Sequence, residues 1–200
     1  MHIKEFEYYS PSSLAEACRL LGSGGPGAKV FAGGTDILPD LKRGRITAGC
    51  LISLAGLTEL RKIERRPLSP ASSLIPHTSS LFIGPLVSPD TLERSALVRE
   101  IFPGLAEAAA SMAAYQVRGM ATIGGNLCSA VPSADLPPSL LTAEAELVLA
   151  SGAGERRLAL KDFFIGPRKT ALRPDEILTG ILIPELSRGT GTAYDRFQAR

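Results

Sequence analysis

The sequence has no tryptophan and few cysteines or histidines, and these shortages exclude several kinds of site. Its three cysteines, Cys18, Cys50 and Cys128, lie far apart in 200 residues. An odd and scattered set excludes a disulfide framework and any metal knuckle built from neighbouring cysteine pairs. With only two histidines, a histidine-rich metal centre is excluded as well. We therefore expect no metal ligands in this chain.

An excess of charge of one sign and a long apolar run are also missing. The formal net charge is +2, from 22 basic and 20 acidic residues, which speaks against a nucleic-acid binder driven by bulk charge. No run approaches the roughly 18 apolar residues of a membrane span. Residues 1–6 lack the basic start and apolar stretch of a secretory signal. These absences predict a cytoplasmic protein with no membrane span and no nucleic-acid partner.

Short strands and helices alternate in the first part of the chain. Ser13 and Glu16 match a capping box, and Cys18 lies on the apolar face of the helix that follows, as a core residue. The alternation is typical of a small parallel βαβ layer. The strands and helices predicted here are 6–9, 14–21, 29–32, 37–42 and 50–54.

Beyond residue 57 the pattern predicts a larger lobe. Residues 65–80, rich in proline and serine, indicate an exposed loop or a hairpin extension, with His77 solvated. We expect an α+β fold of two subdomains: a small parallel βαβ lobe (1–57), and a larger lobe of mixed or antiparallel sheet with helices (58–200). The elements predicted here are a strand at 81–84, helices at 90–101, 105–114 and 137–141, a hairpin of 146–150 with 157–160, a strand at 177–183 and the start of a strand at 192–200.

A glycine-broken loop follows the second predicted strand. Paired glycines let the backbone approach a ligand closely and can point successive N–H groups in one direction. The start of the next helix adds a positive dipole. The loop can therefore cradle a pyrophosphate, and the alternative is a tight turn that only needs flexible dihedral angles. No Rossmann or P-loop fingerprint is present. The residues of this loop are Ala32, Gly33, Gly34, Thr35, Asp36 and Ile37.

A second glycine-broken loop is expected at 119–135. Downstream in it, Asp135 can accept hydrogen bonds from ribose hydroxyls or cap the helix that starts near Pro137. Two loops of this kind suggest a ligand held from both sides, and an elongated dinucleotide fits better than a small metabolite. No acid–base machinery is evident, so a bound cofactor would supply any reactivity. The candidate ligand-binding residues of this loop are Thr122, Ile123, Gly124, Gly125 and Asn126.

At these two loops, and again at 167–178, the sequence resembles the FAD-binding medium subunit of molybdenum hydroxylases, the group that contains carbon monoxide dehydrogenase and xanthine dehydrogenase. The resemblance implies a two-subdomain FAD-binding fold, with the flavin between the lobes. The loop 32–37 and residues 122–126 would bind the pyrophosphate from the two lobes. Asp135 would contact the adenosine ribose, Leu178 would lie near the flavin, and Tyr194 would pack near the isoalloxazine ring.

The same resemblance implies a role and partners. A molybdopterin-binding large subunit would oxidise the substrate, and a small subunit with two-iron, two-sulfur clusters would pass electrons to FAD in this chain. The acceptor would be NAD, a quinone, a carrier protein or oxygen. Such chains form a three-subunit unit that dimerises. Two alternatives remain, a non-redox nucleotide-binding module and a structural subunit that serves only assembly.

The sequence departs from the family pattern at several places. Asp195 stands where many relatives carry lysine, and Val131 stands where serine is common. Cys128, beside the second loop, is interpreted as a small packing residue. Family members continue into a further C-terminal domain, so we expect a fragment or shortened form that ends at Arg200.

Overall fold

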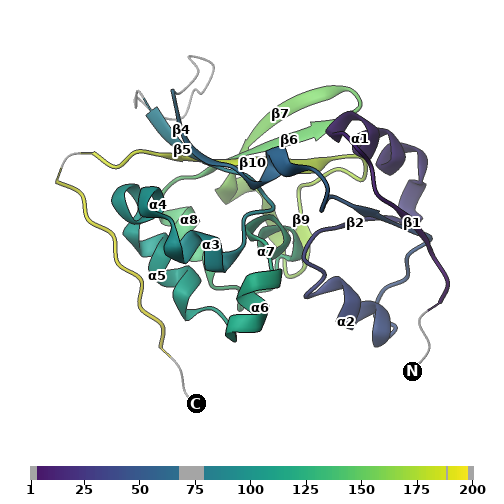
Figure 1. The fold of residues 1–200 in the computed structure, drawn as a ribbon, viewed down its shortest axis with the longest axis horizontal. Helices are drawn as coiled ribbons and strands as arrows, with labels where there is room; N and C mark the ends of the chain where they lie inside the picture. The colour runs from purple at the N-terminus through teal and green to yellow at the C-terminus, as the bar shows by residue number, and fades with distance from the viewer. Residues whose placement is uncertain (1–3, 68–78, 188, 198–200) are drawn as a thin grey trace.

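The computed structural model describes residues 4–67, 79–187 and 189–197. Within them lie a three-stranded, a five-stranded and a two-stranded sheet. Figure 1 shows a layer of helices beneath the five-stranded sheet, and the small sheet beside it with one helix above and one below. The architecture confirms the predicted α+β class.

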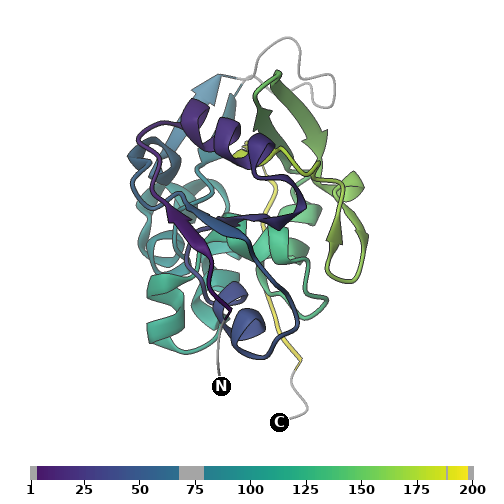
Figure 2. The same ribbon diagram turned by 90° about the vertical axis from the view of Figure 1, so that its right-hand side faces the viewer.

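The first part of the chain forms the three-stranded sheet. Its strand order is β1-β3-β2, and both pairs of neighbours are parallel, as the βαβ interpretation predicts. The turned view in Figure 2 shows α1 and α2 on opposite sides of this sheet. The elements are β1 (Glu7–Tyr9), α1 (Leu14–Ser23), β2 (Ala28–Phe31), α2 (Ile37–Lys42) and β3 (Cys50–Ser53).

The start of α1 is capped much as predicted. Ser13 Oγ accepts a hydrogen bond from the Glu16 N–H at 3.2 Å. The Glu16 carboxylate does not reach Ser13 but accepts from the N–H and hydroxyl of Ser12, at 2.8 and 2.9 Å. One turn later Cys18 is 4% exposed, which confirms it as a core residue. Its thiol faces the Ala150 carbonyl 3.8 Å away, so α1 packs against the second lobe.

The second part forms the larger sheet, in the order β4-β5-β10-β6-β7, with every pair antiparallel. The predicted hairpin around residues 152–154 and the strand from Ile177 are confirmed. The elements are β4 (Ile63–Pro67), β5 (Ser79–Ile83), α3 (Pro89–Arg94), α4 (Ala96–Ile101), α5 (Pro103–Ser111), α6 (Tyr115–Met120), α7 (Ile123–Ser129), α8 (Leu136–Thr142), β6 (Glu146–Ser151), β7 (Gly154–Ala159), β8 (Phe164–Gly166), β9 (Lys169–Thr170) and β10 (Ile177–Pro184).

Of the two interpretations of 65–80, the described ends fit the hairpin. Pro67 pairs with Ser79 in the antiparallel ladder of β4 and β5. His77 and the rest of 68–78 lie outside the described residues.

Three predicted elements are wrong in type or extent. The helix expected at 90–101 is broken at Ser95, whose extended backbone ends α3 and whose hydroxyl caps α4. The loop expected at 119–135 contains α7, because Thr122 caps a helix that runs through the paired glycines. No strand forms over 192–197, where the Thr192 hydroxyl instead accepts a hydrogen bond from the Gly104 N–H at 3.0 Å.

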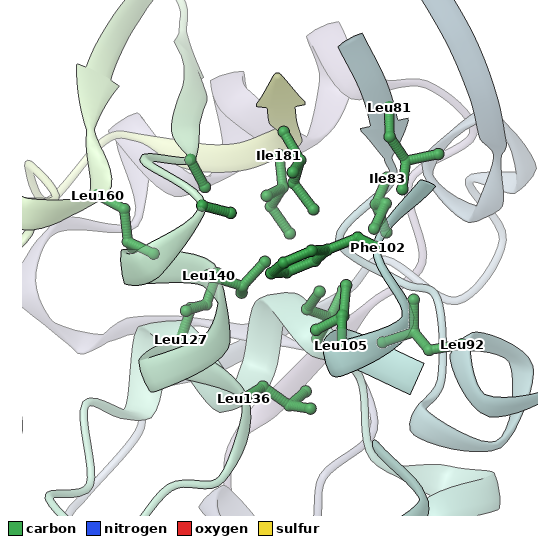
Figure 3. Close-up of a cluster of buried hydrophobic side chains, with 14 of the residues drawn as sticks. Leu81, Ile83, Leu92, Phe102, Leu105, Leu127, Leu136, Leu140, Leu160 and Ile181 are labelled. Atoms are coloured by element: carbon green, nitrogen blue, oxygen red, sulfur yellow. The ribbon is translucent and has the colours of Figure 1, made fainter. Parts of the chain in front are cut away.

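The buried apolar residues form two cores. The larger fills the space between the five-stranded sheet and the helices, with Phe102 at its centre (Figure 3). The smaller surrounds α1 and the parallel sheet, and it includes Leu60, Leu86, Ala150 and Ile177 from beyond residue 57. The lobes therefore share apolar packing, and the boundary between 57 and 58 stays a prediction.

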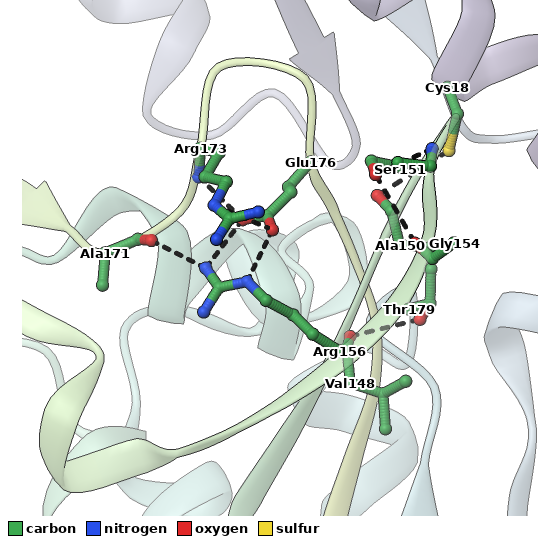
Figure 4. Close-up of polar contacts among 11 residues, drawn as sticks. Cys18, Val148, Ala150, Ser151, Gly154, Arg156, Ala171, Arg173, Glu176 and Thr179 are labelled. Carbon is green, nitrogen blue, oxygen red and sulfur yellow. Dashed lines mark hydrogen bonds and ion pairs between the residues drawn. The ribbon is translucent and has the colours of Figure 1, made fainter.

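A buried carboxylate organises the segment that leads into β10. Glu176, whose side chain is 3% exposed, accepts two hydrogen bonds from the Arg156 guanidinium at 2.6 and 2.8 Å. It also accepts from the Arg173 N–H at 2.8 Å, and Arg156 donates to the Ala171 carbonyl at 3.0 Å (Figure 4). These bonds fix the path of residues 171–176.

Replacing Phe102 with alanine should lower the free energy of unfolding by about 3–5 kcal/mol, because the ring is buried at the centre of the larger core. Phe197→Ala is the control, since that ring is 99% exposed. Urea denaturation measures both variants. Equal stabilities of the two would contradict the core described above.

The Glu176 interaction should depend on pH. The Arg156 hydrogen bonds hold the pKa of Glu176 below its ordinary value of 4.5. A carboxyl group with a lowered pKa stabilises the fold above its ordinary pKa, and this contribution is lost as the pH falls through the folded-state pKa. Glu176→Gln should therefore cost about 2 kcal/mol at pH 7. The difference from wild type should shrink below about pH 4.5, as measured by denaturation across pH; a constant difference would refute the ionic origin.

Candidate functional site

A cleft of about 470 Å³ lies where the two lobes meet. This volume is in the range of small-molecule and cofactor sites. Gly33 and Gly125 both line it, so the two glycine-broken segments share one crevice, as predicted. The other predicted site residues that line it are Ala32, Gly34, Thr35, Asp36, Ile37, Thr122, Gly124 and Leu178.

The first loop presents a run of backbone donors. Within the described part of the chain, no protein group accepts a hydrogen bond from the backbone N–H groups of residues 33–37. Partly buried backbone donors need water or a ligand when the protein offers no acceptor. Gly34 has φ +73°, and a Cβ there would lie 2.9 Å from the Phe31 ring. The loop conformation therefore requires glycine, and its unpaired N–H groups suit an anionic ligand.

Gly33 brings this loop against the second lobe. A Cβ on Gly33 would lie 2.0 Å from the Met120 carbonyl oxygen and 3.1 Å from Ala121 Cα. These neighbours are backbone atoms, which cannot swing aside as the end of a flexible side chain could. The absence of a side chain at Gly33 is what allows the two walls of the cleft to meet.

The second segment is built differently, because its backbone donors are already used. Ile123 and Gly124 donate to the carbonyls of Val87 and Pro85, both at 2.9 Å. Gly125 donates to the Thr122 hydroxyl at 3.0 Å. Glycine at 124 is required for packing, since a Cβ there would lie 2.5 Å from the Pro85 Cβ. This segment thus offers a closely packed wall with few free N–H groups.

Two residues of this segment do not line the cleft. Ile123 is fully buried in the larger core. The side-chain oxygen of Asn126 is buried, and no described residue donates a hydrogen bond to it. An unpaired buried amide oxygen is costly in a folded protein. Asn126 therefore has the capacity to accept a hydrogen bond that the described chain does not supply.

The remaining predicted residues, Asp135 and Tyr194, are not among the residues that line the cleft, and they contact each other. The Tyr194 hydroxyl lies 3.4 Å from Asp135 Oδ1, and Arg196 forms an ion pair with the same oxygen at 3.0 Å. Asp135 occupies the N-cap position of α8 but makes no side-chain capping bond. Asp135 is thus held by the segment after β10, through Tyr194 and Arg196.

The sequence does not point to several residues of the cleft wall. Asp40 and Arg168, from opposite lobes, form an ion pair at 2.8 Å and both line the cleft. They are far apart in sequence, and only Arg168 lies in a stretch that the family resemblance includes. Cys128 also lines the cleft. Burial raises the pKa of its thiol to about 12, so the thiol stays protonated at neutral pH, in keeping with a packing role.

Apolar side chains also line the cleft. Leu54 and Leu86 come from the smaller core, and Ile177 and Leu178 from the start of β10. The cleft thus combines the backbone donors of the first loop with an aliphatic surface. Such a combination can hold a ligand that carries both a charged group and a flat apolar ring.

Comparison with known proteins identifies the family. Residues 4–186 match the model of the FAD-binding domain in molybdopterin dehydrogenase. The carbon monoxide dehydrogenase medium chain of Hydrogenophaga pseudoflava is 34% identical over 195 residues, which cover 98% of this chain and 64% of that one. The xanthine dehydrogenase FAD-binding subunit of Escherichia coli O157:H7 is 32% identical, over 96% of this chain and 63% of that one. The chain thus spans less than two thirds of the length of these curated relatives.

Solved structures agree with this assignment. A carbon monoxide dehydrogenase from Hydrogenophaga pseudoflava, lacking the Mo-pyranopterin moiety of its molybdenum cofactor, superposes with a TM-score of 0.90 at 34% identity, over 100% of this chain and 66% of that one. Quinoline 2-oxidoreductase from Pseudomonas putida 86 gives a TM-score of 0.83 at 30% identity, over 94% and 61%. The expected family, and FAD as its cofactor, are confirmed. This chain belongs to the FAD-binding domains of molybdopterin dehydrogenases.

Proposed function

We propose that this chain holds FAD in the cleft between its lobes and serves as the electron-transfer subunit of a molybdenum-containing dehydrogenase. The observation that carries the proposal is the run of unpaired backbone N–H groups at residues 33–37, in a loop that lines the cleft. Such a run matches the diphosphate of a dinucleotide, because successive amides can bind its oxygens without any basic side chain.

In this proposal the two walls of the cleft bind different parts of FAD. The first loop binds the diphosphate through its N–H groups, and the Thr122–Gly125 segment closes over it from the second lobe. Leu178 and its aliphatic neighbours pack against the flavin ring. Asp135 as a ribose contact and Tyr194 as a ring contact stay predictions, and both require the ligand to extend past the cleft lining.

FAD, when bound, supplies the electron-accepting and electron-donating chemistry. The chain's own residues bind it, orient it and exclude water from its apolar end. Iron–sulfur clusters of the common two-iron type need four cysteine ligands, and this sequence has three scattered cysteines. The clusters that deliver electrons would therefore belong to a partner.

The partners follow from the same proposal. They are a large subunit that binds molybdopterin and oxidises the substrate, and a small subunit with two-iron, two-sulfur clusters. The names of the relatives, which include medium chains and a FAD-binding subunit, support a place in such a complex. The acceptor would be NAD, a quinone, a carrier protein or oxygen.

Within the described residues no helix is long and apolar enough to cross a bilayer. The cytoplasmic location stays a prediction from the sequence.

Ligand titration separates this function from its alternatives. The purified chain should bind FAD and show flavin absorbance, and ADP should compete with FAD while riboflavin competes poorly, because the diphosphate is the group held by the loop. A non-redox nucleotide module would bind ADP and not FAD. A purely structural subunit would bind neither, and either result would refute the proposal.

Gly33→Ala should weaken FAD binding roughly tenfold or more, since a methyl group there must push the two walls apart. Gly22→Ala is the matched control, because Gly22 lies in α1 and a Cβ added there would have no atom within 4 Å. Fluorescence titration gives the affinities, and circular dichroism checks that both variants fold. Wild-type affinity in a folded Gly33→Ala protein would contradict the role of this contact.

A further inference from the structure

Arg168 joins both walls of the cleft. It lies in the turn between β8 and β9, and its backbone N–H donates to the Ala130 carbonyl at 2.8 Å. Ala130 is the C-cap of α7, the helix that carries the second glycine segment. The Arg168 side chain reaches the other way, to Asp40 on α2, with Nη1 2.8 Å from Oδ2. One residue thus connects α7 to α2.

The backbone of Arg168 indicates that the side chain matters at this position. Its φ is +56°, a region that favours glycine, and the neighbouring cap residue Ala130 has φ +46°. A bulky residue in this region is uncommon and costs conformational energy that the surroundings must offset. Both residues of this contact hold that conformation, and the hydrogen bond between them fixes the turn against α7.

Asp40 is well placed to receive the guanidinium. Its side chain is 11% exposed, and its second oxygen, Oδ1, accepts from Arg45 at 3.3 Å. Asp40 lies on the helix that follows directly from the first loop, and the Asp40 N–H donates to the Asp36 carbonyl at 3.1 Å. The Asp40 carboxylate is therefore anchored one helical turn from the loop that presents the unpaired N–H groups.

Among the described residues, this ion pair has no equivalent between the lobes. Over 4–67, 79–187 and 189–197, it is the one ion pair that joins a residue of the parallel-sheet lobe before residue 58 to a residue after it. The lobes also meet at the backbone contact of Gly33 with Met120 and through the smaller apolar core. The groups in those contacts are uncharged, so salt and charge substitution can weaken the ion pair and leave those contacts unchanged.

We propose that Asp40 and Arg168 form a positioning pair, which holds the first loop at the spacing from α7 that the dinucleotide requires. The inference rests on the proposed function, because it names residues that prepare the same cleft for FAD. The pair acts through preorganisation: with the walls already set, less conformational freedom is lost when the ligand binds. Neither residue needs to touch the ligand.

A double-mutant cycle tests the pair. FAD dissociation constants and release rates are measured by flavin fluorescence for wild type, Asp40→Asn, Arg168→Gln and the double variant. Each single substitution should weaken binding roughly tenfold, mainly through faster release, and the double variant should be no weaker than either single one, since both remove the same interaction. Raising the salt concentration should accelerate FAD release from wild type more than from Arg168→Gln.

Arg157→Gln is the matched control. Arg157 forms an ion pair with Glu146 at 3.1 Å, with side-chain exposures of 36% and 8%, close to the 52% and 11% of Arg168 and Asp40. That pair lies within the second lobe, between β7 and β6. The control should keep the wild-type FAD affinity, and thermal unfolding should show that all variants fold.

The outcomes are distinct. If wild type does not bind FAD, the proposed function fails, and the inference fails with it. If wild type binds and Asp40→Asn binds as tightly or more tightly while Arg168→Gln binds weakly, Arg168 contacts the ligand directly and the positioning pair is refuted. Additive losses in the double variant, or an equal loss in Arg157→Gln, would refute it as well.

Discussion

The backbone of Gly33 lies so close to the Met120 carbonyl that no side chain fits between them, and the rest of the cleft depends on this contact. It brings the end of β2 against the chain that leads into α7, and so sets two distant glycine segments on facing walls. Gly124 makes a similar close contact within the second lobe, where it packs on Pro85. At both positions the absence of a side chain serves close packing against another stretch of the chain.

The two glycine segments that line the cleft differ in what they can bind. Within the described residues, the first keeps a run of unpaired N–H groups at 33–37, whereas the second uses its N–H groups to build α7 and to attach it to residues 85–87. One wall can therefore bind a charged group and the other can only confine it. The aliphatic residues at the start of β10 add a surface for an apolar ring.

The first loop and the capped helix before it can be predicted, because both depend on local sequence. The family resemblance correctly places both glycine segments in one crevice. The helical nature of α7 escapes prediction, since paired glycines favour irregular backbone and only the Thr122 cap and tertiary contacts overcome this preference. The contact between Asp40 and Arg168 has no local signal, because the two residues are 128 positions apart in the sequence. Tyr194 and Asp135 also meet through tertiary structure, and neither lines the cleft.

The strand β10 contributes to both apolar cores, and this has a consequence for how the molecule unfolds. The register of β10 against β6 shifts between Leu178 and Gly180, and neighbouring residues of this strand belong to different cores, Ile177 to the smaller and Leu178 to the larger. Loss of packing in either core would therefore destabilise β10, and with it the other core. The two lobes should lose structure together in a single cooperative transition, and the ligand cleft should survive intact until that transition begins.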